Sequence, residues 1–207
     1  MRKRALGVEP QTRLDRKRAE RIAKIVRVAA RLFATRGFES TRFEEIAAVL
    51  DLRGPSLYYY FASKEELFLG CVRQAASEVF ERLRNIVAEG GNYVETLRRL
   101  FREQVLIELR DYPEFVPLFF RIYVPVPALR EEILSLRREH AEIFEQVVRE
   151  LLGRTSGPIT EARLQLEIAF GALAYLPEWY QASGSLSVEE LADLFADALN
   201  EPFTHLR

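Results

Sequence analysis

Apolar side chains recur along this chain at the three- and four-residue spacing of helices, and no stretch shows the alternation of apolar and polar residues typical of strands. The pattern predicts an all-α protein of about nine helices. The segment 113–127 departs from it, because it is apolar and aromatic but contains four prolines and has room for only one short helix. The expected helices span residues 15–36, 41–50, 54–60, 63–89, 92–111, 114–124, 128–152, 160–182 and 187–200.

Several of the expected helix ends carry capping signals. Gly37 follows the first helix, where glycine tolerates the left-handed conformation that often ends helices. Asp51 stands in the turn before the third helix, where we also expect a left-handed residue, and Pro55 presets the φ angle of that helix's first turn. Three Ser/Thr-x-x-Glu sequences predict capping boxes at helix starts: Thr41 with Glu44, Ser63 with Glu66, and Ser187 with Glu190.

The segment 43–64 has the pattern of a helix-turn-helix. Apolar residues on its two helices can close a small core: Ile46, Ala47, Leu50, Leu52 and Leu57. Arg53, Ser56 and the tyrosines 58–60 are then held outward. In a helix-turn-helix the second helix lies in the DNA major groove, and its N-terminal residues meet base edges. The segment therefore predicts a DNA-reading element.

The charge distribution agrees with DNA binding. Residues 1–64 carry 15 Lys and Arg against 7 Asp and Glu, whereas residues 65–207 carry 15 against 24. A basic end supplies the sequence-independent attraction to phosphates on which DNA binding rests. The alternative is a solvated basic helix without a partner, and the coincidence with the helix-turn-helix pattern favours DNA. We expect the first dozen residues to form a flexible basic arm.

Composition argues against several other classes of protein. Cys71 is the single cysteine, so no disulfide framework can form within one chain, which fits a reducing cytoplasm. No signal peptide and no membrane span are recognisable. We find no nucleophile–base arrangement, no Gly-rich phosphate loop and no second metal ligand near His205, so we expect neither an enzyme nor a bound cofactor or metal.

The N-terminal quarter of the chain resembles the TetR family of bacterial transcriptional repressors. The resemblance rests on AARLFATRGFESTRFEEIA, on the spacing to LYYYF, and on FASKEELF directly after it. It implies a helix-turn-helix DNA-binding domain at 1–62 and a helical effector-binding and dimerisation domain at 63–207. It also implies a ligand-responsive repressor on a palindromic double-stranded DNA operator, and a homodimer joined through the last two helices, 160–182 and 187–200.

The resemblance assigns DNA contacts residue by residue. It implies phosphate contacts at Thr41, Arg42, Tyr58 and Lys64, and positions facing bases or groove walls at Arg53, Gly54, Pro55, Ser56, Tyr59 and Tyr60. The residues alone also allow one of the three tyrosines to turn inward and pack the second helix on the first. The chain departs from the family at Leu50-Asp51, Arg53 and Gly54, which puts the operator sequence in doubt and not the binding of DNA.

The C-terminal part holds an aromatic-rich set that can wall a cavity between helices. Ordinary core packing is the alternative for each member, and for His140 a locally hydrogen-bonded core histidine is favoured. The family resemblance implies that such a cavity senses a small molecule. The candidate ligand-binding residues are Phe80, Phe101, Phe119, Phe120, Tyr123, His140 and Phe144.

A narrower resemblance concerns the effector. The sequence EWYQASGSLSVEELAD at 178–193 is similar to the segment that joins the last two helices in regulators of lipid degradation, which implies an acyl-CoA effector. An ordinary helix stop at Gly184 followed by a capped start at Ser187 is the alternative. The phosphates of an acyl-CoA would need arginines, for which Arg121, Arg130, Arg137 and Arg138 are candidates. A protein that binds DNA constitutively, as an architectural or partner-recruiting factor without effector, is the competing hypothesis.

Overall fold

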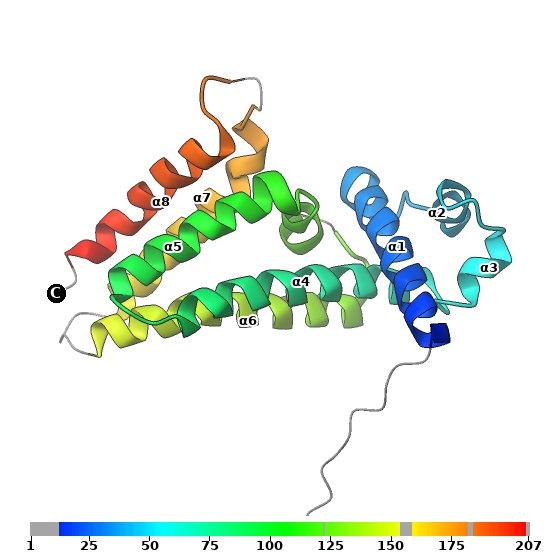
Figure 1. Ribbon diagram of the computed structural model, residues 1–207, viewed down its shortest axis with the longest axis horizontal. Coiled ribbons are helices and arrows are strands. Elements are labelled where there is room, and N and C mark those ends of the chain that lie inside the picture. The colour runs from blue at the N-terminus through cyan, green and yellow to red at the C-terminus, as the bar shows by residue number, and fades with distance from the viewer. Residues whose placement is uncertain (1–12, 122, 154–158, 182–183, 206–207) are drawn as a thin grey trace, which may run out of the picture.

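The computed structural model describes residues 13–121, 123–153, 159–181 and 184–205, and within these ranges the chain is helical without strands. A small N-terminal domain consists of α1 (Arg13–Arg36), α2 (Phe43–Val49) and α3 (Gly54–Tyr58). Figure 1 shows these three helices at one end of the molecule. The prediction of an all-α fold is confirmed, while the expected basic arm lies outside the described residues.

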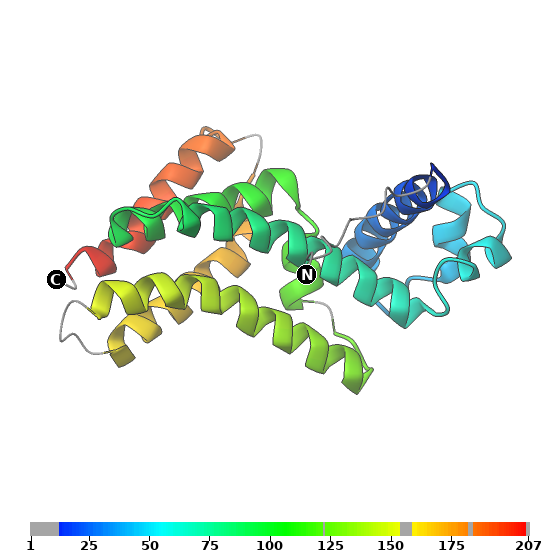
Figure 2. The same cartoon turned by 60° about the horizontal axis from the view of Figure 1, so that its bottom comes forward.

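The larger C-terminal domain is built around α4 (Lys64–Ala88), which runs out of the N-terminal domain and packs along α6 (Pro127–Leu152). α5 (Tyr93–Leu106) lies against α4, α6 and α8 (Val188–Thr204), and α7 (Ile159–Trp179) packs on α6 and α8. α8 lies at the end of the molecule that faces away from α1–α3 (Figure 2). None of the described helices is long and apolar enough to cross a membrane.

Two short π-helical turns connect α5 to α6. η1 (Ile107–Asp111) continues α5 directly, and η2 (Pro117–Arg121) lies in the proline-rich segment. The short helix expected at 114–124 is therefore present as the π-helical turn η2. η2 also packs against α1, so it joins the two domains directly.

Most of the predicted helix ends are confirmed. Gly37 has a φ angle of 82° and Asp51 one of 55°, both in the left-handed region. Ser63 caps α4 by accepting the Glu66 N–H at 3.1 Å. The predicted box there is only half formed, because the Glu66 carboxylate accepts the N–H of Ala62 at 2.6 Å and not that of Ser63. The predicted box at the start of α8 is complete, because Glu190 accepts the Ser187 N–H at 2.9 Å and its own N–H donates to the Ser187 hydroxyl.

The predicted capping box at the start of α2 is wrong. Arg42, not Thr41, is the N-cap residue, and the carboxylate that reaches back to its N–H belongs to Glu45 at 3.2 Å, not to Glu44. The Thr41 hydroxyl instead donates to the carbonyl oxygens of Gly37, at 2.7 Å, and Leu32, at 3.3 Å. These carbonyls at the end of α1 draw the hydroxyl inward and leave the cap to the next residue.

Candidate DNA-reading surface and effector pocket

The helix-turn-helix forms around the small core that the sequence predicts. Ile46 and Leu57 are fully buried, and Leu50 is buried beside them. The left-handed Asp51 lets the chain turn sharply from α2 into α3, since the Leu52 N–H returns to the Ala47 carbonyl at 2.9 Å. α3 is only five residues long, so its orientation depends on this core.

The residues that this core holds outward form an exposed polar and aromatic surface. Arg42 and Arg53 are exposed at the starts of α2 and α3. Tyr58 is 53% exposed with its ring 4.6 Å from that of Phe43, and Tyr59 is 73% exposed. Tyr60 is the tyrosine that turns inward, because it is half-buried against the core with Tyr59 set edge-on at 5.1 Å.

The remaining predicted DNA contacts fall into three situations. The Ser56 side chain is half-buried, and its N–H donates to the Arg53 carbonyl at 2.8 Å. Gly54 and Pro55 form the first turn of α3, and the surroundings of these two residues lie outside the described part of the structure. Thr41 is fully buried, so the expectation that its side chain contacts phosphate is wrong for this conformation.

The side chain of Lys64 is bound to the loop after α1. Its ammonium donates to the carbonyl oxygens of Phe38 at 2.9 Å and Glu39 at 3.3 Å, and it lies 4.5 Å from the centre of the Phe38 ring. The first residue of α4 therefore ties that helix to the loop after α1. Any phosphate contact by Lys64 has to be made in addition to, or in exchange for, these bonds.

The C-terminal domain brings most of the predicted ligand residues together around His140. The ring of His140 lies 5.4–6.5 Å from five phenylalanine rings. Three of these five are among the candidate ligand residues, Phe115 belongs to the aromatic-rich set recognised in the sequence, and only Phe170 was missed; the five are Phe80, Phe115, Phe120, Phe144 and Phe170. Phe119 joins this cluster by stacking on Phe115 at 4.6 Å.

Two predicted ligand residues lie elsewhere. Phe101 is fully buried beyond Phe144, between it and Phe203 of α8, at ring distances of 5.5 and 6.2 Å. Tyr123 is 67% exposed and lines a hollow against the loop after α1, so its assignment to the aromatic cluster is wrong. Val124, the next residue along the chain, is buried instead.

A pocket of about 510 Å³ opens between α6 and α7 beside this cluster. Its inner wall is aromatic, formed by Phe120, His140 and Phe170, and its rim is charged. The rim residues are Arg137, Arg138, Glu142, Glu145, Arg163 and Glu167. The three arginines and three glutamates of the rim balance in charge, and Arg149 beside it, which pairs with both Glu142 and Glu145, adds one positive charge. The pocket can therefore take a ligand with an apolar body and an anionic head.

The arginines of the rim differ in whether they already have partners within the chain. Arg137 is partly buried, donates to the Phe119 carbonyl and lies 5.2 Å from the centre of the Phe120 ring. Arg138 and Arg163 make no ion pair with any described residue. Arg121 was also predicted for a ligand's phosphates, but it is held by Glu178 and the Ala174 carbonyl of α7, and Arg130 does not line the pocket.

A buried polar chain extends from the pocket wall into the domain. The His140 Nε2 lies 3.0 Å from the Gln104 Oε1, and the Gln104 Nε2 donates to the Glu108 Oε1 at 2.8 Å. Burial lowers the pKa of His140 to about 4, so the imidazole is neutral. Burial also raises the pKa of Glu108 to about 8, against the opposing effects of Gln104 and Arg121. Sequence reasoning missed Gln104 and Glu108, although they lie on the same apolar helix stripe as Phe101.

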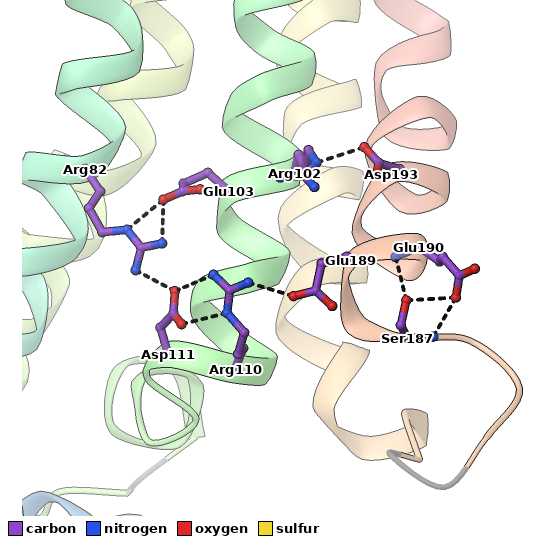
Figure 3. Close-up of polar contacts among 9 residues, drawn as sticks. All are labelled: Arg82, Arg102, Glu103, Arg110, Asp111, Ser187, Glu189, Glu190 and Asp193. Carbon is purple, nitrogen blue, oxygen red and sulfur yellow. Dashed lines mark hydrogen bonds and ion pairs between the residues drawn. The ribbon is translucent and has the colours of Figure 1, made fainter.

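Charged side chains on η1 link three helices at the surface. Figure 3 shows Asp111 between Arg82 of α4 and Arg110, with distances of 2.8 Å to each, and Arg110 continuing to Glu189 of α8 at 2.7 Å. Arg82 also pairs with Glu103 of α5. The hydrogen bond from Arg110, assisted by Arg82, holds the pKa of Asp111 below its usual value. In the described part of the chain, His, Cys, Asp and Glu side chains form no group suited to a metal.

Comparisons with known proteins cover both domains. A family model described as "Bacterial regulatory proteins, tetR family" matches residues 25–71, and one described as "Tetracyclin repressor-like, C-terminal domain" matches residues 90–201. The chain is 31% identical over 194 residues to the HTH-type transcriptional repressor KstR2 of Mycolicibacterium smegmatis, with 86% of this chain and 87% of the relative covered. It is 27% identical to KstR2 of Rhodococcus jostii over 176 residues, with 83% and 85% covered.

A solved structure shares the fold of the whole molecule. It is the crystal structure of AibR in complex with isovaleryl coenzyme A and operator DNA, with a TM-score of 0.76 and 22% sequence identity. The match covers 86% of this chain and 97% of AibR. Both domains, and the way α4 joins them, are thus arranged as in a regulator that was crystallised with DNA and a CoA thioester.

Proposed function

Because the chain belongs to the TetR family of bacterial transcriptional regulators, we propose that it is a homodimeric repressor released from its operator by a small hydrophobic effector, of the acyl-CoA class. The observation that supports the DNA-binding part is the surface along α3. There a buried core holds Arg53, Tyr58 and Tyr59 outward on the basic end of the chain. As a DNA-binding regulator it would act in the cytoplasm.

Arg53 is the proposed base reader. It is exposed at the N-cap of α3, the position of a recognition helix that lies nearest to base edges. An arginine there can pair with guanine O6 and N7, which is worth roughly 1–3 kcal/mol of discrimination. We assign phosphate contacts to Arg42 and Tyr58, and a place along the groove to Tyr59. Lys64 stays a candidate phosphate contact through its position at the start of α4.

The proposed dimer uses the free faces of α7 and α8. One side of α7 packs into its own chain through residues such as Ala169 and Leu173. Its other side exposes large apolar residues, and α8 adds another; they are Leu164, Ile168, Tyr175, Trp179 and Leu194. A second copy of the chain would cover this exposed apolar side. Two such helix pairs would form a four-helix bundle.

The effector would bind in the pocket between α6 and α7. The aromatic wall suits a hydrocarbon chain, each buried CH₂ of which contributes about 0.8 kcal/mol. Arg138 and Arg163 on the rim suit the phosphates of coenzyme A. The structure of AibR supports this class, since AibR was crystallised with isovaleryl coenzyme A.

The effector signal would reach DNA through η2. Phe120 forms part of the pocket wall, and η2, which carries it, packs against α1. A ligand that displaces Phe120 therefore shifts the element that supports the N-terminal domain. For full release the effector must favour the non-binding state by about 10⁴-fold.

The test begins by selecting the operator from a random DNA library with the full-length protein. Operator binding is then followed by fluorescence anisotropy during titration with CoA thioesters of increasing chain length and with free coenzyme A. Release that strengthens with chain length, and not with free coenzyme A, is the expected result. Arg138→Ala with Arg163→Ala should raise the concentration needed for release while unliganded binding stays unchanged, and Arg130→Ala serves as the matched control.

Selection of no DNA sequence would contradict the proposal that the protein is a DNA-binding regulator. Operator binding that no compound releases would favour a constitutive DNA-binding protein.

A further inference from the structure

The carboxyl group of Glu108 has one oxygen without a hydrogen-bond partner. Glu108 is 2% exposed, and its Oε1 accepts from Gln104, whereas its Oε2 has no partner in the described structure. A buried polar atom left unpaired is costly, so native proteins pair nearly all of them. An unpaired buried carboxyl oxygen inside a domain proposed to bind a ligand calls for a functional explanation.

The surroundings of Glu108 determine which form of the carboxyl group is present. Among the described residues no cation forms an ion pair with it. Arg121, the cation that influences it, is already bound to Glu178. A buried carboxylate without a paired cation is strongly disfavoured, so the group is neutral. With Oε1 accepting from Gln104, the proton sits on Oε2, which makes Oε2 a hydrogen-bond donor that lacks an acceptor.

Glu108 also lies on an unusual piece of backbone. It belongs to η1, where the Tyr112 N–H reaches back five residues to the Ile107 carbonyl at 2.8 Å. Single π-helical turns within α-helices occur often at functional sites. From Glu108, Gln104 and His140 form a continuous polar chain to the inner wall of the α6–α7 pocket.

We propose that Glu108 determines the effector's specificity, and that its unpaired oxygen donates a hydrogen bond to a ketone or hydroxyl oxygen on the hydrocarbon part of the effector. This inference rests on the proposed function, because it places the ligand in the same pocket with its head at Arg138 and Arg163. Neither Gln104 nor Glu108 lines the pocket of the unliganded protein, so the wall at Phe120 and His140 has to open for the hydrocarbon part to bring its oxygen to Glu108. The ligand class is thus an oxygenated acyl thioester and not a plain fatty acyl group.

This position also gives the ligand a way to act on the protein. η1 carries Glu108 on its inner side and Arg110 and Asp111 on its outer side, where they join α4 and α8 (Figure 3). A new hydrogen bond at Glu108 therefore acts on the same five-residue turn that holds those two helices. A plain acyl chain cannot form this bond and would leave the turn undisturbed.

The experiment compares decanoyl-CoA with oxodecanoyl-CoA isomers whose ketone lies at successive carbons of the distal half of the chain. Release of full-length protein from its operator is measured for the wild type, Glu108→Gln, Glu108→Leu and Glu108→Met. Binding of octanone isomers and of octene to the DNA-free protein is measured in parallel by thermal shift. Unliganded operator binding reports that each variant is folded, and the methionine variant serves as a second apolar replacement should the leucine variant fold poorly.

For the wild type, at least one oxo isomer should act at roughly 10- to 100-fold lower concentration than decanoyl-CoA. Glu108→Gln should keep this preference, because the amide N–H donates where the neutral carboxyl O–H does. The leucine and methionine variants should lose it. An equal preference in all four proteins overturns the proposal, and so does its loss in the glutamine variant, because the amide N–H of that variant can donate to the same ketone oxygen.

The two series separate this inference from the proposed function. Release by decanoyl-CoA with no preference for any oxo isomer overturns the role of Glu108 and leaves an acyl-CoA-responsive repressor. Glu108-dependent binding of octanones, without release by any CoA thioester, supports the role of Glu108 and overturns the acyl-CoA effector. If no oxygenated probe of either series binds better than its plain counterpart, the inference is wrong.

Discussion

Two basic residues of the N-terminal domain, Arg42 and Lys64, have different tasks in the free protein. The ammonium of Lys64 is bound to two backbone carbonyls at the end of α1. The Arg42 side chain is exposed, and only its backbone takes part in the cap of α2. Family resemblance assigned both to phosphate, but their surroundings predict that only one of them is also needed for stability.

Replacing Lys64 by Ala should lower the free energy of unfolding by roughly 1 kcal/mol, because two hydrogen bonds are lost at a partly exposed site. Arg42→Ala should leave stability within about 0.5 kcal/mol and reduce the slope of log affinity against log salt by about 1. Urea unfolding and operator titrations at several salt concentrations measure both. A Lys64→Ala protein of unchanged stability would contradict the structural role given to its ammonium.

The buried carboxyl of Glu108 predicts a pH dependence of stability. Its pKa is raised by burial to about 8 in the folded chain, whereas in the unfolded chain it titrates near its ordinary value of 4.5. Its contribution is thus fully present below about pH 4.5 and lost as the pH rises through 8. Relative to Glu108→Gln, the wild type should lose stability over this window by up to about 1.4 kcal/mol per pH unit. The lowered pKa of His140 affects stability only below about pH 6.5, and it does so in both proteins, so it does not change the difference between them. Parallel curves for the two proteins would show that Glu108 is charged when folded.

At the scale of helices, the sequence predicted correctly those features that depend only on residues adjacent in the chain. The helix ends at Gly37 and Ser187, and the left-handed turn at Asp51, depend on local backbone preferences and are confirmed. Thr41 was misassigned because carbonyls at the end of α1 compete for its hydroxyl. Tyr123 was misplaced because the course of a proline-rich segment depends on what packs around it.

The ligand site was harder to predict than the DNA-reading surface for the same physical reason. The helix-turn-helix is local in sequence, so its spacing alone placed Arg53 and Tyr58 on one surface. The pocket is assembled from η2, α6 and α7, which only tertiary packing brings together. Gln104 and Glu108 could have been noticed as polar residues on the apolar stripe of α5, but their pairing with His140 needed the position of α6.

The ion pairs of η1 predict how strongly the effector is coupled to α4. Arg82→Met removes the ion pairs of α4 with Asp111 of η1 and Glu103 of α5, so the ratio of operator affinities without and with effector should fall roughly 3- to 5-fold. Arg73→Met removes an ion pair from the same helix to Glu132 of α6, which does not involve η1, and should leave the ratio unchanged. Anisotropy titrations with and without the releasing thioester measure it. Equal effects of both variants would argue against η1 as a coupling element.

At the scale of the whole molecule, the two ends of the chain perform complementary tasks. The N-terminal end carries the excess of positive charge and the exposed α3, and the opposite end, at α7 and α8, carries exposed apolar residues. A single α3 of five residues contacts few base pairs. Operator affinity therefore depends on holding two such helices at a fixed separation, which is the task we assign to the dimer.

Two tyrosines of nearly equal exposure test the dimer. Tyr175 of α7 is 65% exposed and Tyr123 is 67% exposed, but only Tyr175 lies on the proposed dimer face. Tyr175→Glu would bury a pair of like charges between two apolar helices, so the protein should become monomeric, as measured by light scattering. Its operator affinity should fall by about 10²- to 10⁴-fold, because the second half-site loses the effective concentration that linkage provides. Tyr123→Glu should stay dimeric with unchanged operator affinity. A Tyr175→Glu protein that remains a dimer with full affinity would place the dimer contact on another surface of the molecule.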